Sequence, residues 1–205
     1  MLYFVGSVYR HNTKGTHSNI SRYPVLRLIK GRKANILSPV HYRAFLGDNK
    51  VISGHFYFIK DDFFMSLKNC NLMLNKDDEN FRNGRPCHYC FENTDMFWMI
   101  PISSQVEKYR SIYNQKIKQR KIYDGIRFGF VNGQERAFLI QNCFPVTLQY
   151  IDNEYMLNHN TIPATVSKKF SKELNGLVRK VIRLYECGIK ITLTDLQRII
   201  DFIKN

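Results

Sequence analysis

The sequence holds 205 residues, which suits one domain or two small ones. It carries 31 Lys and Arg against 17 Asp and Glu, so its net charge of +14 attracts polyanions. A hydrophobic fraction of 44% excludes a wholly disordered basic chain, and the lack of a long uncharged apolar run excludes a membrane span. Five unevenly spaced cysteines argue against a disulfide framework and predict a cytoplasmic protein.

The charge divides the chain near Gly54. Residues 1–54 hold nine basic residues and one acidic residue, a net charge of +8, whereas residues 55–205 hold 22 basic and 16 acidic residues, a net charge of +6. The first part shows weak hydrophobic periodicity and several turn formers, so we interpret it as a basic N-terminal extension. The alternative is a natural start further downstream, for example at Val51, and the sequence leaves both open.

From His55 onward the pattern predicts a single α+β domain of short strands and amphipathic helices. In chain order we expect a strand over 55–59, a helix over 61–67, a polar loop over 75–84, paired strands over 86–92 and 96–102, a helix over 105–120, a hairpin of 125–131 with 136–141, a strand or short helix over 142–150, and helices over 168–187 and 196–204. The dipeptide Asn132-Gly133 is a strong turn signal inside the hairpin. Thr194 and Gln197 have the spacing of a capping box.

Two consecutive hydroxyls stand where an apolar strand runs into a basic helix. Ser103, Ser104 and the free amides of the first helical turn are expected to point at one spot, and such a spot suits a phosphate. Lys108 lies one turn along the helix and adds positive charge. The alternative is structural, because Ser104 and Glu107 also have capping-box spacing and every helix needs a cap.

A second segment supports the phosphate interpretation. A hairpin places the start of its first strand near the end of its second, so Arg85 and His88 are expected near Ser103 and Ser104. Arginine binds phosphate with two parallel hydrogen bonds, and histidine exchanges protons near neutral pH. The alternatives are an exposed arginine at a strand entrance and a half-buried histidine with a backbone partner.

The remaining candidate groups give weaker signals. Cys87 and Cys90 would face opposite sides of a strand, so we predict neither a metal site nor a cofactor and interpret the cysteines as core or surface residues. We predict RNA contacts for one asparagine and for the basic residues of the first terminal helix, although a solvated helix face explains the charges equally well: Asn142, Lys168, Lys169, Lys172 and Arg179.

From about Gly54 to the C-terminus the sequence resembles the type III toxin–antitoxin endoribonucleases of the ToxN/AbiQ superfamily, especially its CptN/TenpN-like branch. The resemblance rests on four stretches, which are HFYFIKD from His55, Arg85-Pro86 entering a strand, WMIPISSQVEKY over 98–109, and AFLIQN over 137–142 leading to PVTLQY over 145–150. It implies a compact, strongly bent antiparallel β-sheet with a barrel-like core, flanked by α-helices. It also implies a metal-independent endoribonuclease that a small folded repeat RNA inhibits.

Motif by motif, the resemblance places Ser103 and Ser104 on the family's hydroxyl pair and Arg85 where ToxN-like members have a lysine. Two features depart from the family. In the family a lysine follows the hydroxyl pair closely, whereas here the next lysine is Lys108, four residues after Ser104. Phe63 occupies the position in the first helix where the family has an aromatic hydroxyl.

Cleavage of RNA without a metal requires the 2′-hydroxyl to attack its own phosphate, which leaves a 2′,3′-cyclic phosphate and a 5′-hydroxyl. The enzyme must align this attack, move protons and stabilise the added negative charge. We assign charge stabilisation to Arg85 and Lys108, hydrogen bonds on the scissile phosphate to Ser103 and Ser104, and proton transfer to His88. Three tyrosines are expected to stack on unpaired bases: Tyr57, Tyr89 and Tyr109.

The expected partners are a cognate antitoxin RNA, bound in a hetero-oligomer, and cellular or phage RNA as the substrate in phage defence. Two other classes of function fit the composition. The first is a non-catalytic RNA- or DNA-binding module, which would bind with a steep salt dependence and leave strands intact. The second is an interaction protein whose basic extension binds other polyanions.

Overall fold

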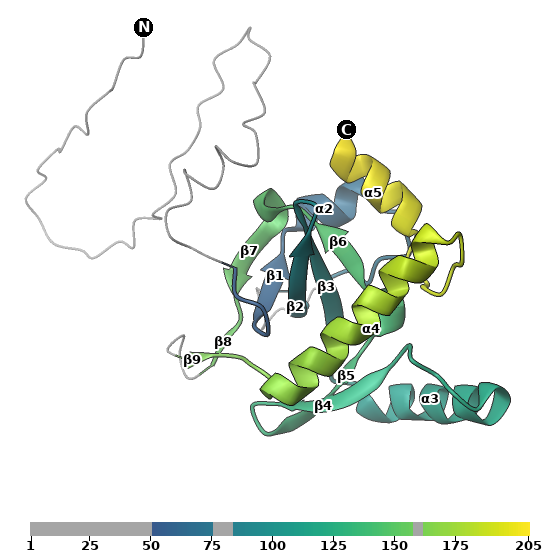
Figure 1. The fold of residues 1–205 in the computed structure, drawn as a ribbon. Helices are drawn as coiled ribbons and strands as arrows, with labels where there is room; N and C mark the ends of the chain where they lie inside the picture. The colour runs from purple at the N-terminus through teal and green to yellow at the C-terminus, as the bar shows by residue number, and fades with distance from the viewer. Residues whose placement is uncertain (1–50, 76–83, 158–161) are drawn as a thin grey trace, which may run out of the picture. The chain divides into compact units, whose positions relative to one another are not determined.

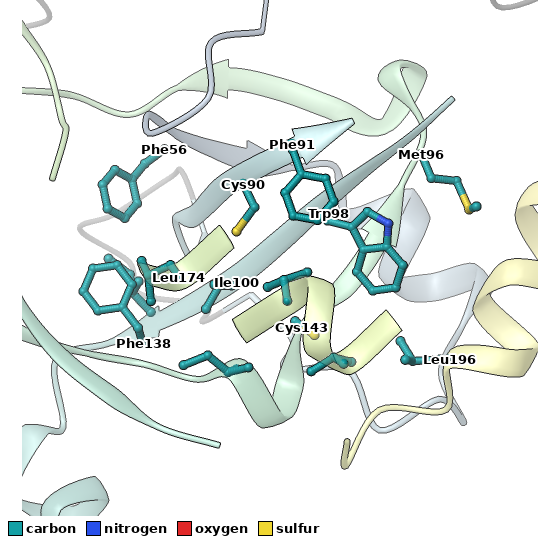
Figure 2. Packing of buried hydrophobic residues seen from close by; sticks show 14 of the residues in the cluster. Phe56, Cys90, Phe91, Met96, Trp98, Ile100, Phe138, Cys143, Leu174 and Leu196 are labelled. Atoms are coloured by element: carbon teal, nitrogen blue, oxygen red, sulfur yellow. The ribbon is translucent and has the colours of Figure 1, made fainter. Parts of the chain in front are cut away.

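The fold is built around a central strand that is buried on both faces. The computed structural model describes residues 51–75, 84–157 and 162–205. Every residue of this strand, β3 (Met96–Ser103), is buried. Trp98 and Ile100 belong to the hydrophobic cluster on one face, together with Leu174, and Figure 2 shows them on that side. Phe97 and Met99 belong to the cluster on the other face. A strand covered on both faces needs a nearly continuous apolar run, which the sequence supplies here.

The strands around β3 form one open antiparallel sheet (Figure 1). Their order across the sheet is β4 (Arg127–Val131), β5 (Gln134–Phe138), β3, β2 (Cys87–Asn93), β1 (Phe56–Ile59) and β7 (Ile151–Glu154). Two strands share one edge of β3. The first half of β3 pairs with β6 (Phe144–Val146), and its end pairs with β5. The expected α+β class with a large antiparallel sheet is therefore confirmed. The sheet is not a closed barrel, because β4 and β7 lie at its two ends rather than pairing with each other.

Helices cover both faces of the sheet and one end of it. Helix α4 (Lys168–Glu186) packs on the face of the sheet that carries Trp98. Helices α2 (Asp61–Ser66) and α5 (Leu196–Lys204) pack on the face that carries Phe97. Helix α5 also contributes residues to the hydrophobic cluster around Trp98. Helix α3 (Val106–Arg120) uses Tyr109 to pack against Ala137 at β5. In Figure 1, α4 crosses the sheet and α3 lies beside the β4–β5 hairpin. No helix in the described residues is both long and apolar enough to cross a membrane.

Left-handed backbone conformations form the tight turns of both predicted hairpins. Thr94 and Asp95 have φ of 52° and 58° between β2 and β3, and Asn132 and Gly133 have φ of 52° and 69° between β4 and β5. Two consecutive residues with positive φ give the turn whose twist matches that of the flanking strands. Both hairpins predicted from the sequence are therefore confirmed.

Several elements differ from the sequence-based expectation. The segment 142–150, which was expected to be a strand or a short helix, contains both. Strand β6 lies in its middle, between short 3₁₀ helices at Ile140–Asn142 and Leu148–Tyr150. Strand β7 and the small ribbon of β8 (Met156–Leu157) with β9 (Ile162–Pro163) were not predicted. Strand β7 has the sequence IDNE, in which Ile151 is the one β-branched residue and the other three are types depleted in strands.

The predicted cap of α5 is wrong by one residue. The side chain of Asp195, and not that of Thr194, accepts the hydrogen bond from the Arg198 amide, at 3.3 Å. Thr194 is fully buried and donates its hydroxyl to the Cys143 carbonyl at 2.9 Å. Its side chain therefore ties the start of α5 to the segment before β6.

The predicted extension ends close to where the described chain begins. Residues 1–50 lie outside the described residues, as does most of the predicted polar loop, at 76–83. The Gly54 amide donates to the Tyr89 carbonyl at 2.9 Å, and the Ser53 hydroxyl donates to the Cys90 carbonyl. The last residues assigned to the extension thus contact β2, and a domain boundary near Gly54 stays a prediction.

Gly129 of β4 allows the first turn of α4 to approach the sheet. A Cβ atom at this position would lie 2.4 Å from Cε1 of Phe170, well inside van der Waals contact. We expect Gly129→Ala to lower the free energy of unfolding by about 1–3 kcal/mol through overpacking, measured by urea denaturation. Phe170→Leu in the same chain should recover part of that loss, because it removes ring atoms from the clash. Equal stability of wild type and Gly129→Ala would contradict this contact.

Candidate functional site

Three segments meet where β3 ends. The β2–β3 ladder pairs Cys87 with Pro101, so the residues just before β2 lie beside the end of β3. The Arg85 side chain crosses this gap and donates from Nη1 to the Ile102 carbonyl oxygen at 2.9 Å. Ser103 and Ser104 follow Ile102 directly, and α3 begins at Val106. The structure thus brings Arg85 next to the strand end that carries the two serines.

Asn75 holds Arg85 in place. Its Oδ1 accepts the backbone amide of Arg85 at 3.0 Å, and its Nδ2 donates to the Ile59 carbonyl at 3.1 Å and to the Asp61 carboxylate at 2.7 Å. Asn75 therefore links the end of β1 and the start of α2 to the entrance of β2. Sequence reasoning missed this residue, because its only signal was a place at the start of a polar stretch.

The Arg85 guanidinium keeps unused donor capacity. Its Nε is buried and has no hydrogen-bond partner among the described residues. The single side-chain bond that the guanidinium makes in this part of the chain is the one to Ile102. A permanently charged fork with unused donors is suited to an anionic oxygen.

The two serines differ in exposure. Ser103 is 5% exposed and pairs with Ala137 of β5, and its Oγ accepts the backbone amide of Gln105 at 3.2 Å. Ser104 is exposed, and its hydroxyl has no hydrogen bond to a described residue. The capping-box alternative for Ser104 and Glu107 is wrong, because the residue before the helix is Gln105 and no side chain caps from that position.

Positively charged groups lie on the segments next to Ser104. The helix dipole places partial positive charge at the start of α3, where Glu107 and Lys108 have amides without a backbone acceptor among the described residues. The Lys108 side chain is exposed, and its Nζ lies 5.8 Å from the ring centroid of Tyr109. Arg85 and the start of α3 both border the strand end that carries Ser104, and Lys108 follows in the first turn of the helix.

His88 does not belong to this spot. It is fully buried, and neither ring nitrogen has a hydrogen-bond partner among the described residues. Its ring packs edge-on against Phe56 and Phe138, at centroid distances of 5.2 and 5.9 Å. Burial, and to a smaller extent the charge of His55, lowers the pKa of His88 to about 3. A neutral imidazole sealed among phenyl rings cannot exchange protons with RNA, so we withdraw the proton-transfer role.

The predicted base-stacking residues are also buried. Tyr57, Tyr89 and Tyr109 are 5–8% exposed, and each packs within a hydrophobic cluster of the core. Asn142 is 7% exposed, in a 3₁₀ turn. The three tyrosines therefore do not present rings on which bases can stack, and Asn142 does not present its amide to RNA, so these predicted contacts are wrong. The predicted basic residues of α4, in contrast, are all exposed: Lys168, Lys169, Lys172 and Arg179.

The cysteines are core or surface residues, as expected. Cys87 and Cys90 lie in the clusters on opposite faces of the sheet, so they cannot share one ion. Cys187, at the end of α4, is exposed, whereas the other four cysteines are buried. Burial raises the pKa of the Cys87 and Cys143 thiols to about 12, which keeps them protonated and poorly nucleophilic at neutral pH.

The buried imidazole makes stability depend on pH. In the unfolded chain His88 takes up a proton as the pH falls below 6.5, whereas in the folded chain it stays neutral down to about pH 3. The contribution of the neutral imidazole to the free energy of unfolding is therefore complete above pH 6.5 and is lost as the pH decreases. Between pH 7 and 5 this contributes a loss of about 2 kcal/mol. We expect His88→Leu to lose correspondingly less stability over that range, measured by urea unfolding at both pH values. Equal losses in the two proteins would refute a buried neutral His88.

No protein-family model and no curated protein match the chain, but solved structures resemble it. One is ToxN, of a bacterial antiviral system regulated by a processed non-coding RNA, with a TM-score of 0.52 and 13% identity over 72% of this chain and 95% of that one. Another is AbiQ, a lactococcal anti-phage endoribonuclease of a type III toxin–antitoxin system, with a TM-score of 0.51 and 16% identity over 71% and 92% of the two chains. The described chain therefore has the fold shared by ToxN and AbiQ, the type III toxin–antitoxin endoribonucleases.

Proposed function

We propose that this protein is the toxin of a type III toxin–antitoxin system and a metal-independent endoribonuclease. The observation that carries the proposal is the Arg85 guanidinium, whose Nη1 donates to the Ile102 carbonyl at 2.9 Å, directly before Ser103 and the exposed Ser104 in the chain. The fold shared with ToxN and AbiQ supports the same function.

The reaction proposed is attack of a ribose 2′-hydroxyl oxygen on the adjacent phosphorus. The 2′-hydroxyl gives its proton to a water molecule, and the new O2′–P bond forms as the P–O5′ bond breaks. The leaving O5′ takes a proton from water, so the products are a 2′,3′-cyclic phosphate and a 5′-hydroxyl. Negative charge builds up on the phosphoryl oxygens in the transition state, and fixed donors aimed at those oxygens lower the barrier. Arginine, lysine and helix amides supply such donors directly.

Each residue of the site has a role in this proposal. Arg85 and Lys108 stabilise the charge on the phosphoryl oxygens, and the start of α3 adds its amides. Ser104 donates a hydrogen bond close to the attacking hydroxyl. Ser103, which is 5% exposed and whose Oγ accepts the Gln105 amide, shapes the loop between β3 and α3 rather than contacting the phosphate directly. Asn75 is a positioning residue that acts through Arg85.

The proposed partner is a small folded antitoxin RNA that contains repeats and closes the protein into an inactive hetero-oligomer. The net charge of +14 and the exposed basic residues of α4 support an RNA partner, because each neutralised phosphate adds a salt-dependent gain in affinity. Cellular or phage RNA is the proposed substrate, in keeping with the anti-phage role of AbiQ.

The direct test is to incubate the purified protein with mixed single-stranded RNA in EDTA and map the fragment ends. We expect 5′-hydroxyl and cyclic-phosphate ends from the wild type. Ser104→Ala and Arg85→Ala should each cut at least about 100-fold more slowly while still binding RNA, since each removes one donor to the transition state. Ser111→Ala, an exposed serine on α3, is the matched control and should cut normally.

Two results would count against this proposal. Full cleavage by Ser104→Ala would remove the site from it. Binding without cleavage by a folded, RNA-free wild-type sample would favour the non-catalytic binding module, whose affinity would fall steeply with salt.

Inhibition by the antitoxin gives an independent prediction. If the gene lies downstream of short tandem repeats, one transcribed repeat should suppress cleavage when mixed with the wild-type protein. A scrambled RNA of equal length is the control, because it carries the same charge without the fold. Equal inhibition by both RNAs would contradict a specific antitoxin.

A further inference from the structure

One face of α4 carries a basic stripe with a glycine at its centre. Lys169, Lys172, Gly176, Arg179 and Arg183 follow one another at spacings of three and four residues, which places them on one side of the helix. All five are exposed. At about 1.5 Å per residue the stripe is about 21 Å long. None of the ion pairs among the described residues involves Arg179 or Arg183, so their charges are not neutralised within this part of the chain.

Gly176 has no structural reason to be glycine. A Cβ atom there would meet nothing within 4 Å, and its φ is not in the left-handed region. Glycine inside a helix lowers stability relative to alanine, so this choice works against the fold. Its effect is to leave the helix backbone open where it lines a pocket of about 440 Å³. We call this pocket the Gly176 notch, and its lining residues are Phe91, Asn93, Gly176, Arg179, Ile182 and Arg183.

The walls of the notch combine stacking, hydrogen-bonding and charged groups. The Arg179 guanidinium carbon lies 4.1 Å from the ring centroid of Phe91, a cation–π contact that holds the guanidinium in place. Phe91 is only 8% exposed, so most of the surface that this pair offers to a ligand belongs to the guanidinium. The amide of Asn93 is exposed at the end of β2, and Arg183 stands one turn beyond Arg179.

We propose that the Gly176 notch binds an unpaired nucleotide of an RNA strand that lies along the basic stripe of α4. The base stacks on the Arg179 guanidinium above the bare backbone of Gly176, Asn93 bonds to the base edge, and Arg183 holds a flanking phosphate. The inference rests on the proposed function for its choice of RNA as the ligand. The notch lies at the end of β2 opposite Arg85, so it is separate from the candidate cleavage site.

The test uses a short, fluorescent, mixed-sequence 2′-O-methyl RNA in EDTA at about 0.15 M salt. This RNA lacks the attacking hydroxyl, so binding is measured whether or not the protein cleaves RNA. Gly176→Gln fills the notch and improves helix propensity, so we expect unchanged or higher thermal stability with about tenfold weaker binding. Arg179→Ala should weaken binding similarly. Lys68→Ala removes one exposed charge from the turn after α2, on the other face of the sheet, and should have much less effect.

Three results would overturn the notch. The first is wild-type affinity in folded Gly176→Gln. The second is an equal loss of affinity in Arg179→Ala and Lys68→Ala, which would indicate net charge alone. The third is an equal loss of polyphosphate binding in Gly176→Gln, because polyphosphate has no base to stack. Failure of the proposed function is read separately, as intact cleavable RNA in the presence of the wild type.

Discussion

The pairing of β2 with β3 is the interaction on which the rest of the structure depends. Side chains of β3 alternate between two hydrophobic clusters, so a slip of one residue would exchange Trp98 and Ile100 with Phe97 and Met99 and misfit both. Burial on both faces therefore specifies the register strongly. The same register sets Cys87 opposite Pro101, and it thereby delivers Arg85 to the Ile102 carbonyl.

The candidate site lies at the margin of this rigid core. Its backbone comes from strand ends that cannot move without disturbing buried packing. Its donors are the exposed Ser104 hydroxyl, the Arg85 guanidinium and the amides at the start of α3. Donors fixed in advance stabilise developing charge without reorganising during the reaction. Asn75 extends this order to the Arg85 backbone, because its amide bonds to two other segments.

Helix α4 has two faces with different tasks. Leu174, Val178 and Val181 close the cluster over Trp98, and the opposite face carries the basic stripe. The helix is thus anchored by apolar burial, while no cationic side chain of the basic stripe forms an ion pair with a described residue. In the proposed arrangement, RNA contacts the protein at both ends of β2. Cleavage takes place near Arg85, before the start of this strand, and a nucleotide binds near Arg179, at its other end.

Local sequence determined most of the elements of this protein. The apolar run of β3, the helical periodicity of α3 and α4, and the Asn132-Gly133 turn each carry their own signal, so their types and positions were predictable. The approach of Arg85 to the serines was predictable too, since a hairpin dictates it.

Tertiary structure decided which side chains stay accessible. Tyr57, Tyr89, Tyr109 and His88 have the chemistry of RNA contacts, but segments distant in sequence bury them. The link through Asn75 and the pocket over Gly176 likewise exist only where such segments meet. Burial depends on which elements pack together, and no local pattern contains that information.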